Sequence, residues 1–204
     1  MNIYEDIAKR TNGEIYIGVV GPVRTGKSTV IKKFMEEFVL QNIESAYDRE
    51  RAMDEMPQSA SGKTIMTTEP KFIPDEAIAI KVAGASMRVR LIDCVGYMID
   101  GAIGNTENGE ARMITTPWDP SPMEFEKAAE LGTRKVICDH STVGMVVTTD
   151  GSIGDFSRED YLKSEERVIS ELMALNKPFV IILNSTTPND KKTQELAERV
   201  FNSS

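Results

Sequence analysis

The sequence contains little histidine, tryptophan or cysteine. Its 204 residues include one His, one Trp and two Cys, so neither a disulfide framework nor a zinc site of the usual ligand spacing can be built. Cys94 and Cys138 each stand among apolar neighbours. We therefore expect both to be buried free thiols in a reducing compartment.

Long apolar runs and an excess of basic charge are also missing. The longest apolar runs, such as residues 179–183, are far too short to span a bilayer, and the acidic N-terminus lacks the apolar region of a signal peptide. Acidic residues number 32 against 24 Lys and Arg, a net charge of −8, which argues against a broad nucleic-acid footprint. We expect a cytoplasmic protein without a nucleic-acid partner.

The rest of the composition is that of a globular protein. Hydrophobic residues make up 40% and charged residues 27%, with 14 Gly and 9 Pro, which excludes a disordered or fibrous chain. A chain of this length can bury a sizeable core without disulfides. We expect residues 1–204 to form one domain.

Apolar strand-like runs alternate with helical periodicity along much of the chain. Strands are predicted at 15–20, 88–93, 144–149 and 179–184, and helices at 28–40, 122–131, 157–174 and 187–201. The continuous apolar strands are typical of a sheet covered on both faces. The order predicts an α/β fold with a mostly parallel sheet flanked by helices. Residues 41–70 and 97–142 resist this pattern and predict long functional loops.

A phosphate-binding loop follows the first strand. Residues 21–28 read Gly-Pro-Val-Arg-Thr-Gly-Lys-Ser, which fits G-x-x-x-x-G-K-[ST] between a buried strand and an amphipathic helix. The loop N–H groups would face the β-phosphate at the positive end of the helix dipole. Lys27 would reach the β- and γ-oxygens, and Ser28 would place its hydroxyl on Mg²⁺. The motif predicts a P-loop NTPase.

Two further segments complete this prediction. Asp93 ends an apolar strand and Gly96 follows, so the carboxylate would hold the Mg²⁺ shell through water and the glycine N–H would sense the γ-phosphate. A hydroxyl from residues 62–70 is needed to complete the metal shell, and Thr67 and Thr68 are the candidates. Either threonine could instead satisfy a turn.

The segment that reads the base departs from the guanine-specific pattern N-K-x-D. Residues 184–187 read Asn-Ser-Thr-Thr, so the carboxylate that accepts two hydrogen bonds from guanine is missing, and most guanine discrimination should be lost. Tyr97 stands where Ras-type proteins have a water-positioning Gln, so hydrolysis must be slow or differently organised. The residues expected to bind nucleotide are Gly21, Pro22, Val23, Arg24, Thr25, Gly26, Lys27, Ser28, Thr29, Gly96 and Asn184.

Several segments together resemble the ATPase-domain family of stage IV sporulation protein A from endospore-forming bacteria. They are residues 18–29, 61–72, 93–97, 132–137, 140–144 and 148–155. The resemblance extends over essentially the whole chain, and the middle two of these segments are not generic P-loop features.

The resemblance implies a GTPase-like P-loop ATPase with extended switch-region loops. In that family the paired threonines act in hydrolysis, which falls here on Thr67 and Thr68, while the Walker lysine and aspartate fall on Lys27 and Asp93. The implied catalytic set is Lys27, Thr67, Thr68 and Asp93, the implied metal set is Ser28, Thr67, Thr68 and Asp93, and the ligands are Mg²⁺ and ATP.

The resemblance also implies partners. Family members polymerise into the basal layer of the spore coat around the forespore, in the mother-cell cytoplasm. A C-terminal region that this sequence lacks handles the forespore membrane surface and other coat proteins, so we expect a truncated chain.

Three readings of the site stay open from the residues. One is an ATP hydrolase whose turnover switches an assembly surface. Another is a structural scaffold that binds nucleotide without turnover, and the last is an atypical GTPase in which Asn184 and another loop read guanine. In the ATP hydrolase, loss of the γ-phosphate would relax residues 62–70 and 93–112 and so change the assembly surface.

Overall fold

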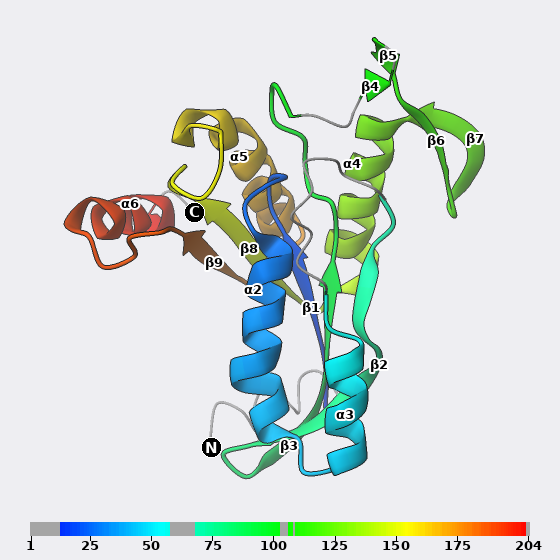
Figure 1. The fold of residues 1–204 in the computed structure, drawn as a ribbon, viewed down its shortest axis with the longest axis vertical. Coiled ribbons are helices and arrows are strands. Elements are labelled where there is room, and N and C mark those ends of the chain that lie inside the picture. Colours follow the sequence, from blue (N-terminus) through cyan, green and yellow to red (C-terminus); the bar gives the residue numbers. More distant parts are fainter. Residues whose placement is uncertain (1–12, 58–67, 103–105, 108, 203–204) are drawn as a thin grey trace.

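The computed structural model describes residues 13–57, 68–102, 106–107 and 109–202. A five-stranded sheet forms its centre, in the order β2-β3-β1-β8-β9 (Figure 1). The strands of this sheet are β1 (Glu14–Val20), β2 (Lys71–Val82), β3 (Ala85–Asp93), β8 (Val143–Thr149) and β9 (Phe179–Asn184). All neighbouring pairs are parallel except β2 and β3. The predicted α/β fold with a mostly parallel sheet is confirmed.

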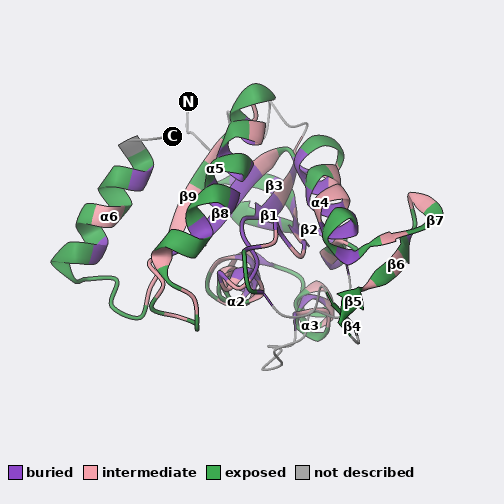
Figure 2. Cartoon of the chain, turned by 90° about the horizontal axis from the view of Figure 1, so that it is seen from above, coloured by how far each residue is buried: buried purple, intermediate pink, exposed green. Residues whose placement is uncertain are grey.

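Helices cover both faces of the sheet. Seen from above, α2 (Lys27–Phe34) and α3 (Ala46–Asp54) lie below the sheet, while α4 (Phe125–Lys135) and α5 (Arg158–Ala174) lie above it (Figure 2). The last helix, α6 (Lys191–Asn202), lies beyond β9. Short turns of π-helix, η1 (Met35–Val39) and η3 (Val136–His140), continue α2 and α4, and η2 (Leu40–Asn42) follows η1.

The core explains why the strands are apolar throughout. Adjacent residues of one strand point to opposite faces of a sheet. Val19 therefore packs with α2 and α3, and its neighbour Val20 packs with η3 and α5; Leu91 and Ile92 divide in the same way. A strand buried on both faces cannot alternate with polar residues.

The two stretches predicted as loops contain regular structure. Residues 41–70 include α3, and residues 97–142 include two small hairpins and a longer helix than expected. The hairpin strands are β4 (Thr106–Glu107), β5 (Glu110–Ala111), β6 (Met113–Thr116) and β7 (Asp119–Glu124). The helix predicted at 122–131 was placed too early, because residues up to Glu124 pair with β6.

Strand β2 was not predicted, and one expectation about the cysteines was wrong. The strand forms because it pairs with β3 along most of its length. Cys94 is buried as expected, whereas Cys138 is exposed on η3. In the described part of the chain, no helix is long and apolar enough to cross a membrane.

Candidate nucleotide site

The site lies where the parallel strands end. Because β3, β1, β8 and β9 run in the same direction, their last residues meet at one edge of the sheet. Asp93 ends β3 there and Asn184 ends β9, while residues 21–26 connect β1 to α2. In open α/β sheets this carboxyl edge is where ligands bind.

Lys27 is held inside the loop that precedes its helix. Its Nζ donates to the carbonyl oxygens of Pro22 at 2.6 Å and Gly21 at 3.4 Å, and the residue is 6% exposed. Burial lowers the pKa of Lys27, and the nearby Cys94 and Asp93 oppose this shift. A buried ammonium held by neutral carbonyl oxygens is well suited to attract an anion such as phosphate.

The start of α2 leaves donors for a phosphate. Gly26 caps the helix without a side-chain hydrogen bond, and the first turn contains no acidic residue. The free N–H groups of a helix start, together with its dipole, form an anion-binding site. Thr25 is buried and its hydroxyl donates to the Pro22 carbonyl at 3.0 Å, while Thr29 is exposed on the first turn.

Ser28 and Asp93 form a close pair across the site. The Ser28 hydroxyl donates to Asp93 Oδ2 at 2.6 Å. Burial raises the pKa of Asp93, and the Ser28 hydrogen bond and the charge of Lys27 act against it. Within the described residues no group of three or more His, Cys, Asp or Glu could form a metal site. A hydroxyl and one carboxylate fit Mg²⁺ that takes its other ligands from phosphate and water.

Gly96 packs directly against the phosphate-binding loop. At its φ of +94°, a Cβ would lie 2.1 Å from the Gly21 oxygen and 2.6 Å from Lys27 Nζ, so only glycine fits. Its N–H donates to Thr133 Oγ1 of α4 at 3.2 Å. Next in sequence, the Tyr97 carbonyl accepts the N–H of Val23 at 2.9 Å. The predicted γ-phosphate sensor therefore lies beside the lysine expected to bind that phosphate.

Of the two candidate threonines, only Thr68 lies among the described residues, and Thr67 lies outside them. Thr68 is 3% exposed, and its carbonyl oxygen lies against α4, where a Cβ on Gly132 would approach it to 2.6 Å. The metal role of both threonines stays a prediction.

Asn184 supports the loop. Its Nδ2 donates to the Thr25 carbonyl at 3.1 Å. In the following turn, the Ser185 hydroxyl donates to Asp150 Oδ2 at 2.6 Å and accepts the Thr187 N–H at 3.0 Å. The Asp150 carboxylate also accepts the N–H of Ser152 at 2.9 Å. These contacts hold the segment that we expect to face the base.

Arg24 and Tyr97 also border the site. Arg24 is partly buried and holds a positive φ of 61° in the loop. Tyr97 is 1% exposed, and its hydroxyl donates to Glu171 Oε2 of α5 at 2.5 Å. The guanidinium of Arg167 lies 4.1 Å from the centre of the Tyr97 ring. The side chain at the position of the Ras-type glutamine is therefore anchored to α5.

The sequence motifs did not predict Thr133 and Glu171 as neighbours of the site. Thr133 belongs to the segment 132–137, and the family resemblance carried by that segment was the available signal for it. Glu171 lies in a charged helix and has no such signal. Both contacts join residues that are far apart in the chain, by 37 and 74 positions.

Comparisons with known proteins identify relatives. The family described as "Stage IV sporulation protein A, ATPase domain" matches residues 1–203. Stage IV sporulation protein A is 57% identical over 96% of this chain in Clostridioides difficile, and 56% identical over 97% in Bacillus subtilis. The chain spans 40% of the length of each of these relatives. A crystal structure of an SsGBP mutant has a TM-score of 0.49 and 16% identity, covering 98% of this chain and 48% of that one.

Proposed function

Because the chain belongs to the stage IV sporulation protein A family of ATPase domains, we propose that it binds and hydrolyses Mg²⁺-ATP at the edge where β1, β3 and β9 end. One observation carries this proposal. Lys27, a buried cation bonded to loop carbonyls, lies beside the Ser28–Asp93 pair at an uncapped helix start. This arrangement provides an anion site and a divalent-cation site side by side.

In the proposed mechanism, the chain contributes binding and orientation. Lys27 and the loop N–H groups hold the β- and γ-phosphates. Ser28, Asp93 through water, and Thr67 or Thr68 form the shell of Mg²⁺, which would neutralise charge that develops on the phosphates. Thr67 or Thr68 also positions the attacking water or senses the γ-phosphate. Burial of Lys27 and Asp93 strengthens these electrostatic interactions.

ATP is the proposed nucleotide because nothing at residues 184–187 replaces the guanine-reading carboxylate of N-K-x-D. The Asn184 side-chain amide donates to the Thr25 carbonyl, and the Asp150 carboxylate near this turn accepts hydrogen bonds from Ser152 and Ser185. A site that lacks the carboxylate of N-K-x-D discriminates poorly in favour of guanine.

We further propose that turnover drives self-assembly of the basal spore-coat layer, in the mother-cell cytoplasm at the forespore surface. Loss of the γ-phosphate would relax the loops around Thr68 and Gly96 and change a surface used in assembly. Contacts to the membrane surface and other coat proteins belong to the longer family proteins.

The anchored Tyr97 favours a second candidate, a scaffold that binds nucleotide with no significant turnover. The Tyr97 side chain is held by Glu171 and Arg167 and cannot position water as a glutamine does. If Thr67 and Thr68 supply this function, the chain is an ATPase. If they do not, it is a nucleotide-binding scaffold.

Thermal unfolding with Mg²⁺ and increasing ATP or GTP tests the nucleotide assignment, because a ligand of the folded state raises Tm with concentration. We expect a larger rise with ATP, and a larger rise with GTP would make the chain an atypical GTPase. Lys27→Ala should abolish the rise, while Lys33→Ala on the exposed side of α2 should keep it. An unchanged rise in Lys27→Ala would overturn the site.

Single-turnover hydrolysis separates the ATPase from the scaffold. The double variant Thr67→Ala, Thr68→Ala should bind ATP and lose at least about a hundredfold in rate, the typical effect of removing groups that act on the transition state. Ser170→Ala, which removes an exposed hydroxyl on α5, is the control. Normal turnover in the double variant would exclude a role for these threonines.

A further inference from the structure

Two neighbouring residues of α4 contact both loops proposed to sense the γ-phosphate. The hydroxyl of Thr133 accepts the N–H of Gly96 at 3.2 Å, and Thr133 is fully buried. One residue earlier, a Cβ on Gly132 would lie 2.6 Å from the Thr68 carbonyl oxygen. Helix α4 therefore meets the Gly96 loop and the Thr68 segment at the same place.

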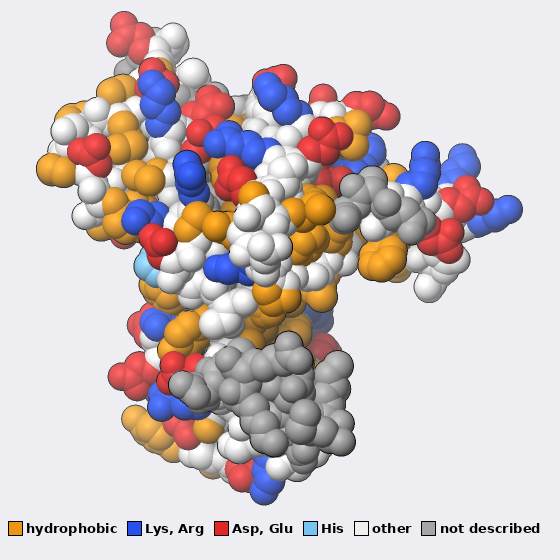
Figure 3. All heavy atoms as spheres, turned by 180° about the vertical axis from the view of Figure 1, so that it is seen from behind, with side chains coloured by type: hydrophobic (Ala, Val, Ile, Leu, Met, Phe, Trp, Pro, Cys, Tyr) orange, Lys and Arg blue, Asp and Glu red, His pale blue; other side chains and the backbone are white. Residues whose placement is uncertain are grey.

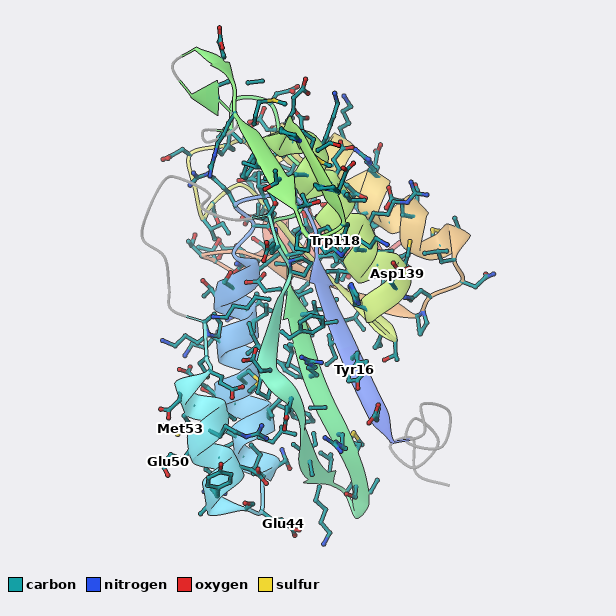
Figure 4. The ribbon with its side chains drawn as sticks, turned by 90° about the vertical axis from the view of Figure 1, so that its right-hand side faces the viewer. Tyr16, Glu44, Glu50, Met53, Trp118 and Asp139 are labelled. Atoms are coloured by element: carbon teal, nitrogen blue, oxygen red, sulfur yellow. The ribbon has the colours of Figure 1, made fainter. Side chains whose placement is uncertain are left out.

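Glycine at position 132 is what allows this approach. Besides the Thr68 oxygen, a side chain at this position would meet Trp118, which packs 3.7 Å from the position a Cβ would take. Figure 4 shows Trp118 beside α4, in the turn between β6 and β7. Because Gly132 has no side chain, the backbone of α4 lies directly against the backbone of Thr68.

The Gly96 N–H has two competing acceptors in the proposed function. It lies close to Lys27, since a Cβ on Gly96 would lie 2.6 Å from Lys27 Nζ, so a γ-phosphate oxygen held by that lysine would be within its reach. An N–H donates one full hydrogen bond, and donation to phosphate therefore requires release from Thr133. Tyr97 stays anchored during such a change, by its contacts with Glu171 and Val23.

We propose that Thr133 is a positioning residue of the nucleotide site, whose hydroxyl holds the Gly96 N–H when no γ-phosphate takes it and releases it to ATP. The inference rests on the proposed function. ADP leaves the Gly96–Thr133 hydrogen bond intact and ATP replaces it, so this bond disfavours ATP relative to ADP. Helix α4 is the element that responds to the exchange, because Thr133 belongs to it.

Titration calorimetry with ADP and with a non-hydrolysable ATP analogue, both with Mg²⁺, tests this role. Thr133→Val removes the hydroxyl and leaves the Gly96 N–H unpaired with ADP but paired with the analogue. We expect affinity for the analogue to rise about tenfold while affinity for ADP stays unchanged, the effect of one buried unpaired N–H. Thr133→Ser should restore the affinities of the unchanged chain.

Controls make each outcome decisive. Thr116→Val replaces another buried threonine, on β6, and should change neither affinity. If Thr133→Val folds poorly, Thr133→Ala removes the same acceptor and should give the same ratio of affinities. Equal changes for both nucleotides, or none, would show that Thr133 is merely structural. No binding of either nucleotide by the unchanged chain would overturn the proposed function itself.

Discussion

Asp93, which we propose holds Mg²⁺ through water, is costly to the fold. Its carboxylate is partly buried near Lys27 and accepts the Ser28 hydroxyl, and burial raises its pKa. A carboxyl whose folded pKa is raised binds protons more strongly when folded. The free energy of unfolding therefore falls as pH rises from 3.8, the ordinary pKa of an aspartate, through the raised pKa of Asp93 in the folded chain.

We predict that Asp93→Asn removes Mg²⁺-dependent ATP binding and leaves the chain as stable or more stable by about 1 kcal/mol at pH 7. Asparagine keeps an oxygen for Ser28 and has no charge to desolvate. Urea unfolding at pH 7 and pH 4 measures the effect, and the difference between the two proteins should shrink at pH 4. A large loss of stability at pH 7 would contradict it.

At the scale of elements, a buried ion pair within α5 is linked by hydrogen bonds to Thr148 near the end of β8. Arg158 donates to both carboxylate oxygens of Glu165 at 2.6 Å, and the Thr148 hydroxyl also donates to Glu165. The side chains of Arg158 and Glu165 are 13% and 6% exposed. Breaking one partner of such a pair leaves an uncompensated buried charge.

Glu165→Ala should therefore lower the free energy of unfolding by about 3 kcal/mol, measured in urea. The matched control is Glu130→Ala, which breaks the exposed pair with Arg167 between α4 and α5 and should cost less than about 1 kcal/mol. Similar costs for both variants would mean that burial does not set the strength of these pairs.

The elements also show what sequence patterns can and cannot predict. Strands β1 and β8 were predictable because burial on both faces demands apolar residues throughout, and β3 and β9 were predictable from the short apolar runs that end them. Helix α3 was missed since it buries only Ala52 and therefore has almost no apolar stripe. The motif residues Lys27, Ser28 and Asp93 were predictable from local spacing, whereas Thr133 and Glu171 reach the site through contacts between distant segments.

At the scale of the whole molecule, the two edges of the central sheet differ. Strand β2 carries Pro74 and charged residues, features that prevent edge-to-edge pairing. Strand β9 reads Phe-Val-Ile-Ile-Leu-Asn without a charge, and Val180 is 57% exposed. Hydrophobic side chains are visible on this part of the molecule in Figure 3, near the projecting α6. Leu175 and Phe201 are also exposed.

An uncharged, exposed edge strand favours association of chains. We predict that Val180→Lys lowers concentration-dependent association in sedimentation velocity and leaves ATP binding unchanged. Met53→Lys adds the same charge at an exposed residue of α3 (Figure 4) and should not lower association. Equal effects of both substitutions would assign any change to net charge instead of the β9 edge.

The anchored Tyr97 also restricts how this chain could evolve. Replacing it with the glutamine of Ras-type proteins would remove the ring beneath Arg167 and the hydroxyl that binds Glu171, and would open a hole in the packing between the Gly96 loop and α5. Faster hydrolysis by that route would require compensating changes on α5 first. Any substitution of Tyr97 therefore weakens the packing against α5 before it can change the chemistry of the site.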